Sequence, residues 1–97
     1  MIKNLNVTIG ASATQLCKPS IRCVWATFCN RDAHAMAVGG SDVSVGNQGK
    51  GIPLSVGGSN YQNGPYISQT NLAAWYVAGT QNDILSITYE DGVDNLG

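Results

Sequence analysis

The stretch that decides the fold is Tyr76-Val77-Ala78-Gly79-Thr80-Gln81-Asn82-Asp83-Ile84-Leu85-Ser86-Ile87-Thr88-Tyr89-Glu90, near the end of a chain of 97 residues. In its second half Leu85, Ile87 and Tyr89 occupy alternate positions, which is the period-2 pattern of a half-buried β-strand. Its first half is followed by Gly79-Thr80-Gln81-Asn82, and Gly and Asn are typical of turns. The stretch therefore predicts a pair of strands joined by a turn.

Similar signals recur along the rest of the chain. The strands expected from them are residues 4–9, 13–17, 21–28, 35–38, 52–56, 72–78 and 84–89. Segment 13–17 is expected to pair back on the first strand. The run from Ile21 to Phe28 is apolar on both faces, which is typical of a central strand covered on both sides. Pro53 indicates an edge strand, because proline cannot donate a hydrogen bond to a ladder.

No segment predicts a helix, because the one candidate, residues 71–76, lies among strand formers and turn residues. Trp25 and Trp75 lie within apolar runs and are predicted to be core residues. Many short strands separated by Gly-rich turns indicate an all-β fold, a small antiparallel β-sandwich or jelly-roll-like barrel. We expect a single domain over residues 1–90 and a C-terminal tail over 91–97.

Residues 57–71 show no periodicity and are rich in Gly, Asn, Ser and Gln. A loop of this length within a small domain is uncommon and is often functional. Its tyrosines can bury a ring against a protein or a sugar while the hydroxyl keeps a polar contact; packing of the loop onto its own sheet is the alternative. The candidate protein-contact residues are Tyr61, Asn63 and Tyr66 in this loop, with Asp91 and Asp94 in the tail.

Charge is scarce in this chain and nearly balanced. Five Lys and Arg against six Asp and Glu give a net charge of −1, and charged residues make up only 11% of the sequence. A nucleic-acid binder or a membrane-surface protein would show a basic stripe, so neither partner is expected. No apolar run approaches the ~20 residues of a membrane span. A surface this poor in charge suits a protein that lies against partners, and equally a neutral soluble domain.

The cysteines and the single histidine offer little chemistry. Cys17, Cys23 and Cys29 are spaced by six, which matches neither the C-x2-C pairs of zinc sites nor a redox motif, so we expect small buried thiols. His34 has only Asp32 as a local acid, and the two are expected to form a solvated loop pair rather than a catalytic base with its orienting group.

The remaining motifs do not complete a known site. Gly46–Gly51 contains a Gly-Lys pair, but the first Gly and the final Ser or Thr of a phosphate-binding loop are missing. Residues 91–95 offer oxygen ligands without the length or the closing Glu of a calcium loop, so a frayed tail or a weak surface cation site remains. We expect no enzyme activity, no catalytic residue, no cofactor and no structural metal.

Three segments together resemble a known pattern. They are Val38-Gly39-Gly40-Ser41-Asp42-Val43, Gly51-Ile52-Pro53-Leu54-Ser55-Val56-Gly57-Gly58 and the stretch 76–90 quoted above. They are similar to the small virion structural proteins of tailed bacteriophages, of the head-decoration or cement kind, over roughly residues 36–90. The resemblance implies a β-sandwich that sits on a capsid, commonly as an oligomer such as a trimer, without catalytic residues.

Two functions follow from the resemblance and the surface. The first is a decoration or cement protein that binds the major capsid protein and stabilises the head, located on the capsid surface after synthesis in the host cytoplasm. The second is a receptor- or carbohydrate-binding module of a tail fibre or other virion appendage, with Tyr61 and Tyr66 in its site.

Overall fold

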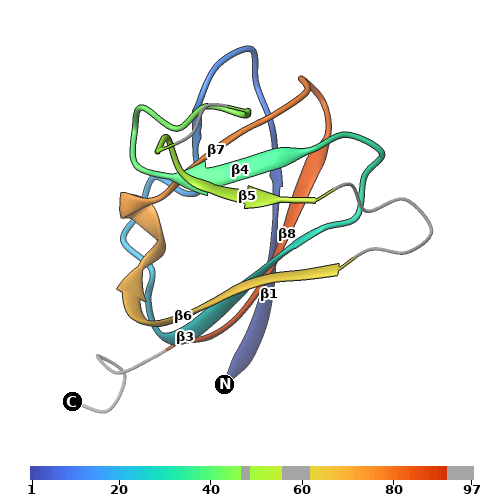
Figure 1. Cartoon of the computed structure of the whole chain (residues 1–97). Helices are drawn as coiled ribbons and strands as arrows, with labels where there is room; N and C mark the ends of the chain where they lie inside the picture. Colours follow the sequence, from blue (N-terminus) through green and yellow to red (C-terminus); the bar gives the residue numbers. More distant parts are fainter. Residues whose placement is uncertain (47–48, 56–61, 92–97) are drawn as a thin grey trace.

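Two antiparallel sheets of four strands each make up the protein in this computed structural model, which describes residues 1–46, 49–55 and 62–91 (Figure 1). The strands are β1 (Ile2–Thr8), β2 (Thr14–Gln15), β3 (Arg22–Asn30), β4 (Met36–Gly39), β5 (Ile52–Leu54), β6 (Gln62–Asn71), β7 (Tyr76–Ala78) and β8 (Ile84–Asp91). The prediction of an all-β antiparallel sandwich is confirmed.

The first sheet has the order β1-β8-β3-β6 and the second has the order β2-β7-β4-β5. This exchange of consecutive strands between two facing sheets is the arrangement of a jelly roll, which closes an eight-stranded chain into a sandwich. Strands β7 and β8, predicted as a pair, lie in opposite sheets, so the turn between them crosses from one layer to the other (Figure 1).

The core lies between the two sheets. Its fully buried side chains include Phe28, Leu85 and Ile87 from the first sheet and Met36, Val38 and Val77 from the second. Residues from the connections complete it, namely Ile9, Leu16 and Leu72. The Phe28 ring lies 5.4 Å from the Trp75 ring, centroid to centroid, with the planes inclined by 58°. Such a tilted aromatic contact stabilises the core by about 0.5–1.5 kcal/mol beyond the effect of burying the two rings.

Strand β3 contains a β-bulge that changes which side chains reach the core. Its pairing with β8 shifts between Cys23 and Trp25, so that one extra residue is accommodated on β3. As a result Cys23, Ala26 and Phe28 are buried, whereas Trp25 is only partly buried and its Nε1 donates to Glu90 Oε1 (3.0 Å). Strand β3 lies between β8 and β6, so the prediction of a central strand is confirmed. The predictions that both of its faces are covered and that Trp25 lies in the core were wrong, while Trp75 packs against the core as expected.

The prediction of an irregular loop over residues 57–71 was also wrong for residues 62–71. Residues Gln62–Asn71 form β6, the longest strand, which pairs along β3. The backbone hydrogen bonds that β3 offers on this side require a partner strand, and this long-range pairing overrides the local turn propensity of the sequence.

Two smaller expectations differ from the structure. The segment predicted to pair with the first strand contributes β2, which pairs with β7 instead. The strand predicted over 72–78 begins as a 3-10 turn, Leu72–Ala74, because the side chain of Asn71 caps it by accepting from Ala73 N (3.0 Å). Val43 and Val45 lie in a turn region, where Val43 is buried against the glycine-rich connection.

Pro53 lies in β5, at the edge of the second sheet, as predicted. Strand β5 is only three residues long, and its proline pairs opposite Ala37 of β4. A short strand that contains proline discourages further strand addition at that edge.

Candidate functional site

The outer face of the first sheet carries a row of uncharged polar side chains. Residues directly opposite one another in an antiparallel sheet share a face, so Asn4, Thr88 and Thr27 lie side by side across β1, β8 and β3. The next row contains Asn6, Ser86 and Cys29 in the same order. Since the alternate residues of β8 fill the core, these two rows face away from it. We refer to these six residues as the polar face.

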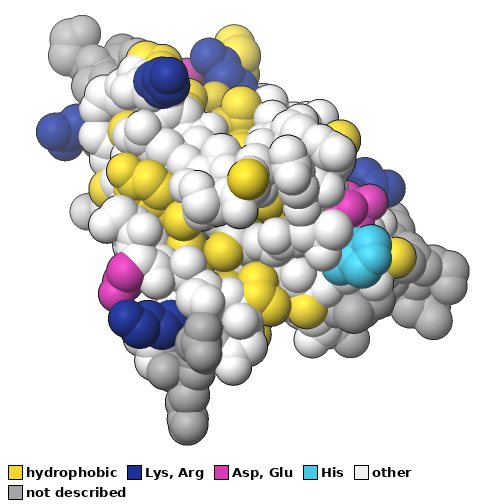
Figure 2. Space-filling model, turned by 90° about the horizontal axis from the view of Figure 1, so that it is seen from above, with side chains coloured by type: hydrophobic (Ala, Val, Ile, Leu, Met, Phe, Trp, Pro, Cys, Tyr) yellow, Lys and Arg dark blue, Asp and Glu magenta, His cyan; other side chains and the backbone are white. Residues whose placement is uncertain are grey.

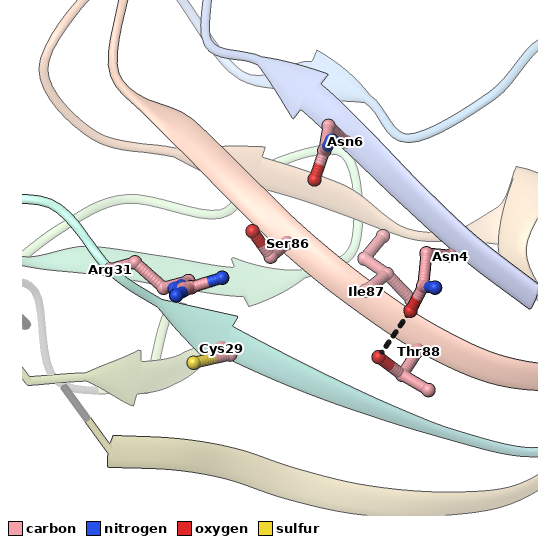
Figure 3. Close-up of a pocket in the computed structure, with 7 residues that line it drawn as sticks. All are labelled: Asn4, Asn6, Cys29, Arg31, Ser86, Ile87 and Thr88. Carbon is pink, nitrogen blue, oxygen red and sulfur yellow. Dashed lines mark hydrogen bonds between the residues drawn. The ribbon is translucent and has the colours of Figure 1, made fainter.

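A shallow pocket of about 420 Å³ opens on the polar face (Figure 3). It is lined by Asn4, Asn6, Cys29, Arg31, Ser86, Ile87 and Thr88. Thr88 Oγ1 donates to Asn4 Oδ1 (2.9 Å), which fixes the amide against β8. The lining therefore offers amides, hydroxyls, a thiol and one guanidinium, and no carboxylate.

The predicted contact residues lie in different parts of the molecule. Tyr61 and Asp94 fall outside the described residues. The backbone register places Tyr66 opposite Thr27 and Asn63 opposite Cys29, on the strand next to the polar face. Asp91 is the last residue of β8 rather than part of a tail. The backbone register thus places Asn63 and Tyr66 beside the polar face, and Asp91 belongs to a separate ion-pair cluster.

That cluster joins the start of β1 to the end of β8. Lys3 Nζ lies 3.0 Å from Asp91 Oδ2, and the N-terminal amine lies 3.6 Å from Asp91 Oδ1. The hydrogen bond and the charge of Lys3 hold the pKa of Asp91 below its ordinary value, and Asp91 in turn raises the pKa of Lys3. Met1 and Lys3 are exposed, whereas Asp91 is partly buried. Ion pairs with exposed partners are screened by water, so the cluster aligns the two strands more than it stabilises the fold.

We expect Lys3→Gln to raise the pKa of Asp91 toward that of an isolated aspartate, because its largest cause of lowering is removed. A carboxyl whose pKa is lowered in the folded state contributes stability above its unfolded pKa and loses it as pH falls through the folded value. The variant should therefore lose part of its stability above about pH 4. An NMR titration of the Asp91 carboxyl measures the shift directly. Lys50→Gln, which removes the separate pair with Asp42, serves as the control and should leave Asp91 unchanged.

His34 pairs with a carboxylate that is remote in sequence. Its Nδ1 lies 2.8 Å from Asp83 Oδ2, whereas Asp32 Oδ2 accepts from the backbone N of Ile84 (2.7 Å). The expected pair of His34 with Asp32 was therefore wrong, and Asp32 instead fixes the start of β8. Among the described residues, no group of three His, Cys, Asp or Glu side chains could hold a metal ion.

The three thiols are free, and they have different surroundings. Burial raises the pKa of Cys23 and of Cys17, so both stay protonated at neutral pH and behave as small apolar groups. Cys29 does not fill core space as predicted, because the bulge in β3 leaves it on the polar face, in the pocket lining.

The polar face was not predicted from the sequence, although the alternation of residues in two strands indicates part of it. The alternation that marks β8 as a strand also assigns Ser86 and Thr88 to one outer face, and the same pattern in β1 assigns Asn4 and Asn6. What the sequence could not supply is the neighbour relation of β1, β8 and β3, which the jelly-roll topology creates.

The fold and this face define a small jelly-roll domain. Comparisons with protein-family models, with curated proteins and with solved structures find no match. No helix in the described part of the chain is long and apolar enough to cross a membrane.

Proposed function

We propose that the protein is a non-catalytic structural module that decorates or cements a bacteriophage capsid by binding the major capsid protein. The observation that carries the proposal is the polar face, which spans β1, β8 and β3 with amide, hydroxyl and thiol side chains. Two charged residues lie beyond its opposite ends, Arg31 in the pocket lining and Glu90 beside Trp25. Uncharged polar groups cost far less to desolvate than charges and can exchange water for a partner's hydrogen bonds.

The opposite side of the molecule is also poor in charge. Figure 2 looks onto the side of the second sheet and shows hydrophobic and uncharged polar groups across its middle, with the charged side chains toward the margins. A cement protein contacts neighbouring subunits on more than one side, and neutral faces on both layers of the sandwich suit that arrangement. Each stable contact of this kind buries about 800 Å² per partner.

The fold supports the proposal by analogy. Jelly rolls occur in viral capsid proteins and in lectins, although a fold by itself does not determine function. The resemblance of residues 36–90 to head-decoration proteins favours the capsid, and it also implies location on the virion surface. An oligomer would fit the symmetry of a capsid lattice.

The test is binding of the purified protein to capsids that lack it, measured by co-sedimentation. We expect saturation at many copies per particle. Ser86→Arg should weaken binding at least about tenfold, because a guanidinium placed in the middle of the contact would be buried without a partner. Ser41→Arg, at an exposed turn of the other sheet, is the matched control for the added charge.

Two results would contradict the proposal. One is that purified virions contain only a few copies, located at the tail. The other is that Ser86→Arg binds capsids as well as the control Ser41→Arg and the native protein do.

The pocket favours a second candidate, a carbohydrate-binding module of a tail fibre or another appendage. A volume of about 420 Å³ lies within the usual range of small-ligand sites, and amides with hydroxyls are suitable partners for sugar hydroxyls. In this case Asn6→Ala with Ser86→Ala should abolish adsorption to the host while the heads keep their heat resistance. A loss of heat resistance with normal adsorption would instead support the capsid.

A further inference from the structure

The free edge of β1 has backbone groups that no strand of the described residues pairs with. Strand β1 is the outermost strand of the first sheet, and its register with β8 is unbroken from Ile2 to Thr8. Beyond its two ends, Asp91 N donates to the Met1 carbonyl (3.2 Å) and Ile9 N donates to the Asp83 carbonyl (2.8 Å). Bonded residues alternate along an antiparallel strand, so the odd-numbered residues of β1 bond β8. The N–H and C=O groups of Ile2, Asn4, Asn6 and Thr8 therefore face away from the sheet.

The other three edges of the sandwich each carry a feature that discourages strand addition. Strand β2 is two residues long, β5 contains Pro53, and β6 contains Pro65 and a register shift against β3. Strand β1 has seven residues, no proline and no bulge. Natural proteins protect edges of this kind unless a partner covers them.

Charge is also almost absent from the β1 edge. Lys3 is the one charged residue of the strand, and its ammonium is already paired with Asp91 of β8. A strand that is otherwise neutral can approach a copy of itself without repulsion, provided that the two lysines do not lie opposite each other.

We propose that β1 pairs antiparallel with β1 of a second copy around a twofold axis beside Leu5, joining two sheets into one continuous sheet. In this register Asn4 lies opposite Asn6 of the second copy, and Ile2 lies opposite Thr8. The four outward N–H groups of each copy then donate to the four outward carbonyls of the other. Lys3 lies opposite Val7, so like charges do not meet.

The side chains of this register are complementary as well. Ile2, Asn4, Asn6 and Thr8, whose backbone groups are free at the edge, have their side chains on the outer face of the sheet. The side-chain amides of Asn4 and Asn6 therefore meet across the axis and extend the polar face into the second copy. At the ends, Ile2 (61% exposed) meets Thr8 of the second copy, and Ile84 (43% exposed) lies beyond that Thr8 in the same row. The pairing thus gathers two of the exposed apolar side chains into one row.

Two double variants test both the pairing and its register, measured by sedimentation of the isolated full chain. The native protein should sediment as a dimer that dissociates on dilution. Asn4→Lys with Asn6→Lys places like charges opposite each other twice, and we expect dimerisation to weaken at least about tenfold. Asn4→Lys with Asn6→Glu changes the same two exposed positions but places opposite charges across the axis, and it should restore the dimer.

Hydrogen exchange of the backbone amides gives a second readout, because even-numbered and odd-numbered residues of β1 should behave differently. The backbone amides at positions 4 and 6 should exchange slowly in the native dimer and rapidly in the double-lysine variant. The backbone amide of Leu5, which bonds to β8, should stay protected in both. Circular dichroism confirms that each variant is folded.

Three results would overturn the proposal. They are a native protein that stays monomeric at all concentrations, a double-lysine variant that associates as tightly as the native chain, and a Lys/Glu variant that behaves like the Lys/Lys variant. The dimer is independent of the proposed capsid partner, because these experiments contain no capsid.

Discussion

Replacing Phe28 with alanine is expected to lower the free energy of unfolding by about 3–5 kcal/mol. The Phe28 side chain is 0% exposed and lies against Trp75 in the middle of the core. The substitution removes buried apolar surface and leaves a cavity that the two rigid sheets cannot close. Domains of this size are stable by about 5–15 kcal/mol, so the loss is a large part of the total. Urea denaturation followed by tryptophan fluorescence measures it.

The neighbouring residue in the same strand supplies the control. Thr27 lies on the polar face and is only partly buried, so Thr27→Ala leaves the core intact and should cost about 1 kcal/mol or less, the range that strand propensity spans. Similar losses for the two variants would mean that Phe28 does not fill the core.

The parts of the fold that the sequence predicted correctly are those governed by local alternation. In β8, Leu85, Ile87 and Tyr89 are buried in turn, as their spacing required, because each strand position has only two directions to face. The short length of the segments and the lack of a helical period also led to the correct fold class. The pairing of β1 with β8, across nearly the whole chain, is not a local property and could not be predicted from spacing.

Strand β3 shows why alternation fails at a bulge. Counting by twos from Cys23 places Trp25 on the same face, and the extra residue in the ladder moves Trp25 and Cys29 to the outer face instead. The residue types of Cys23-Val24-Trp25 do not predict the bulge, because the bulge arises from the register of β3 with β8. The polar face therefore includes a cysteine whose position no pattern in the sequence could give.

Residues 62–71 show the opposite error, in which local composition suggested a loop. Gly64 and Pro65 are poor strand formers, yet the segment pairs along β3 as an edge strand, where proline is tolerated. The pair of His34 with Asp83 is also a contact between segments that are distant in the sequence. The turn after β3 and the residue before β8 meet only in the folded sandwich (Figure 1).

Asn30→Asp should destabilise the fold by about 2–5 kcal/mol at neutral pH, although the two side chains have the same shape. Asn30 is 1% exposed, and its Nδ2 donates to the carbonyls of His34 (2.8 Å), Ser55 (2.9 Å) and Leu54 (3.4 Å). Its Oδ1 accepts from Asp32 N (2.9 Å). The amide thereby joins the end of β3 in one sheet to the end of β5 in the other. An aspartate would direct a negative oxygen at carbonyl oxygens that need a donor.

The same argument fixes the pH dependence of this variant. Burial and the facing carbonyls raise the folded pKa of the new carboxyl above the unfolded value of about 3.9. Its neutral form is then the one that the fold tolerates, so the destabilisation is smallest below about pH 4. It should grow by about 1.4 kcal/mol per pH unit up to the folded pKa and stay constant above it.

Chemical denaturation at a series of pH values measures this profile, with two controls. Asn6→Asp makes the same chemical change at an exposed position and should show almost no loss at any pH. Asn30→Ala removes the hydrogen bonds without adding a charge, so its loss should not vary with pH relative to the native protein. A flat profile for Asn30→Asp would mean that the side chain can turn to water, and that the amide does not join the two sheets as the structure has it.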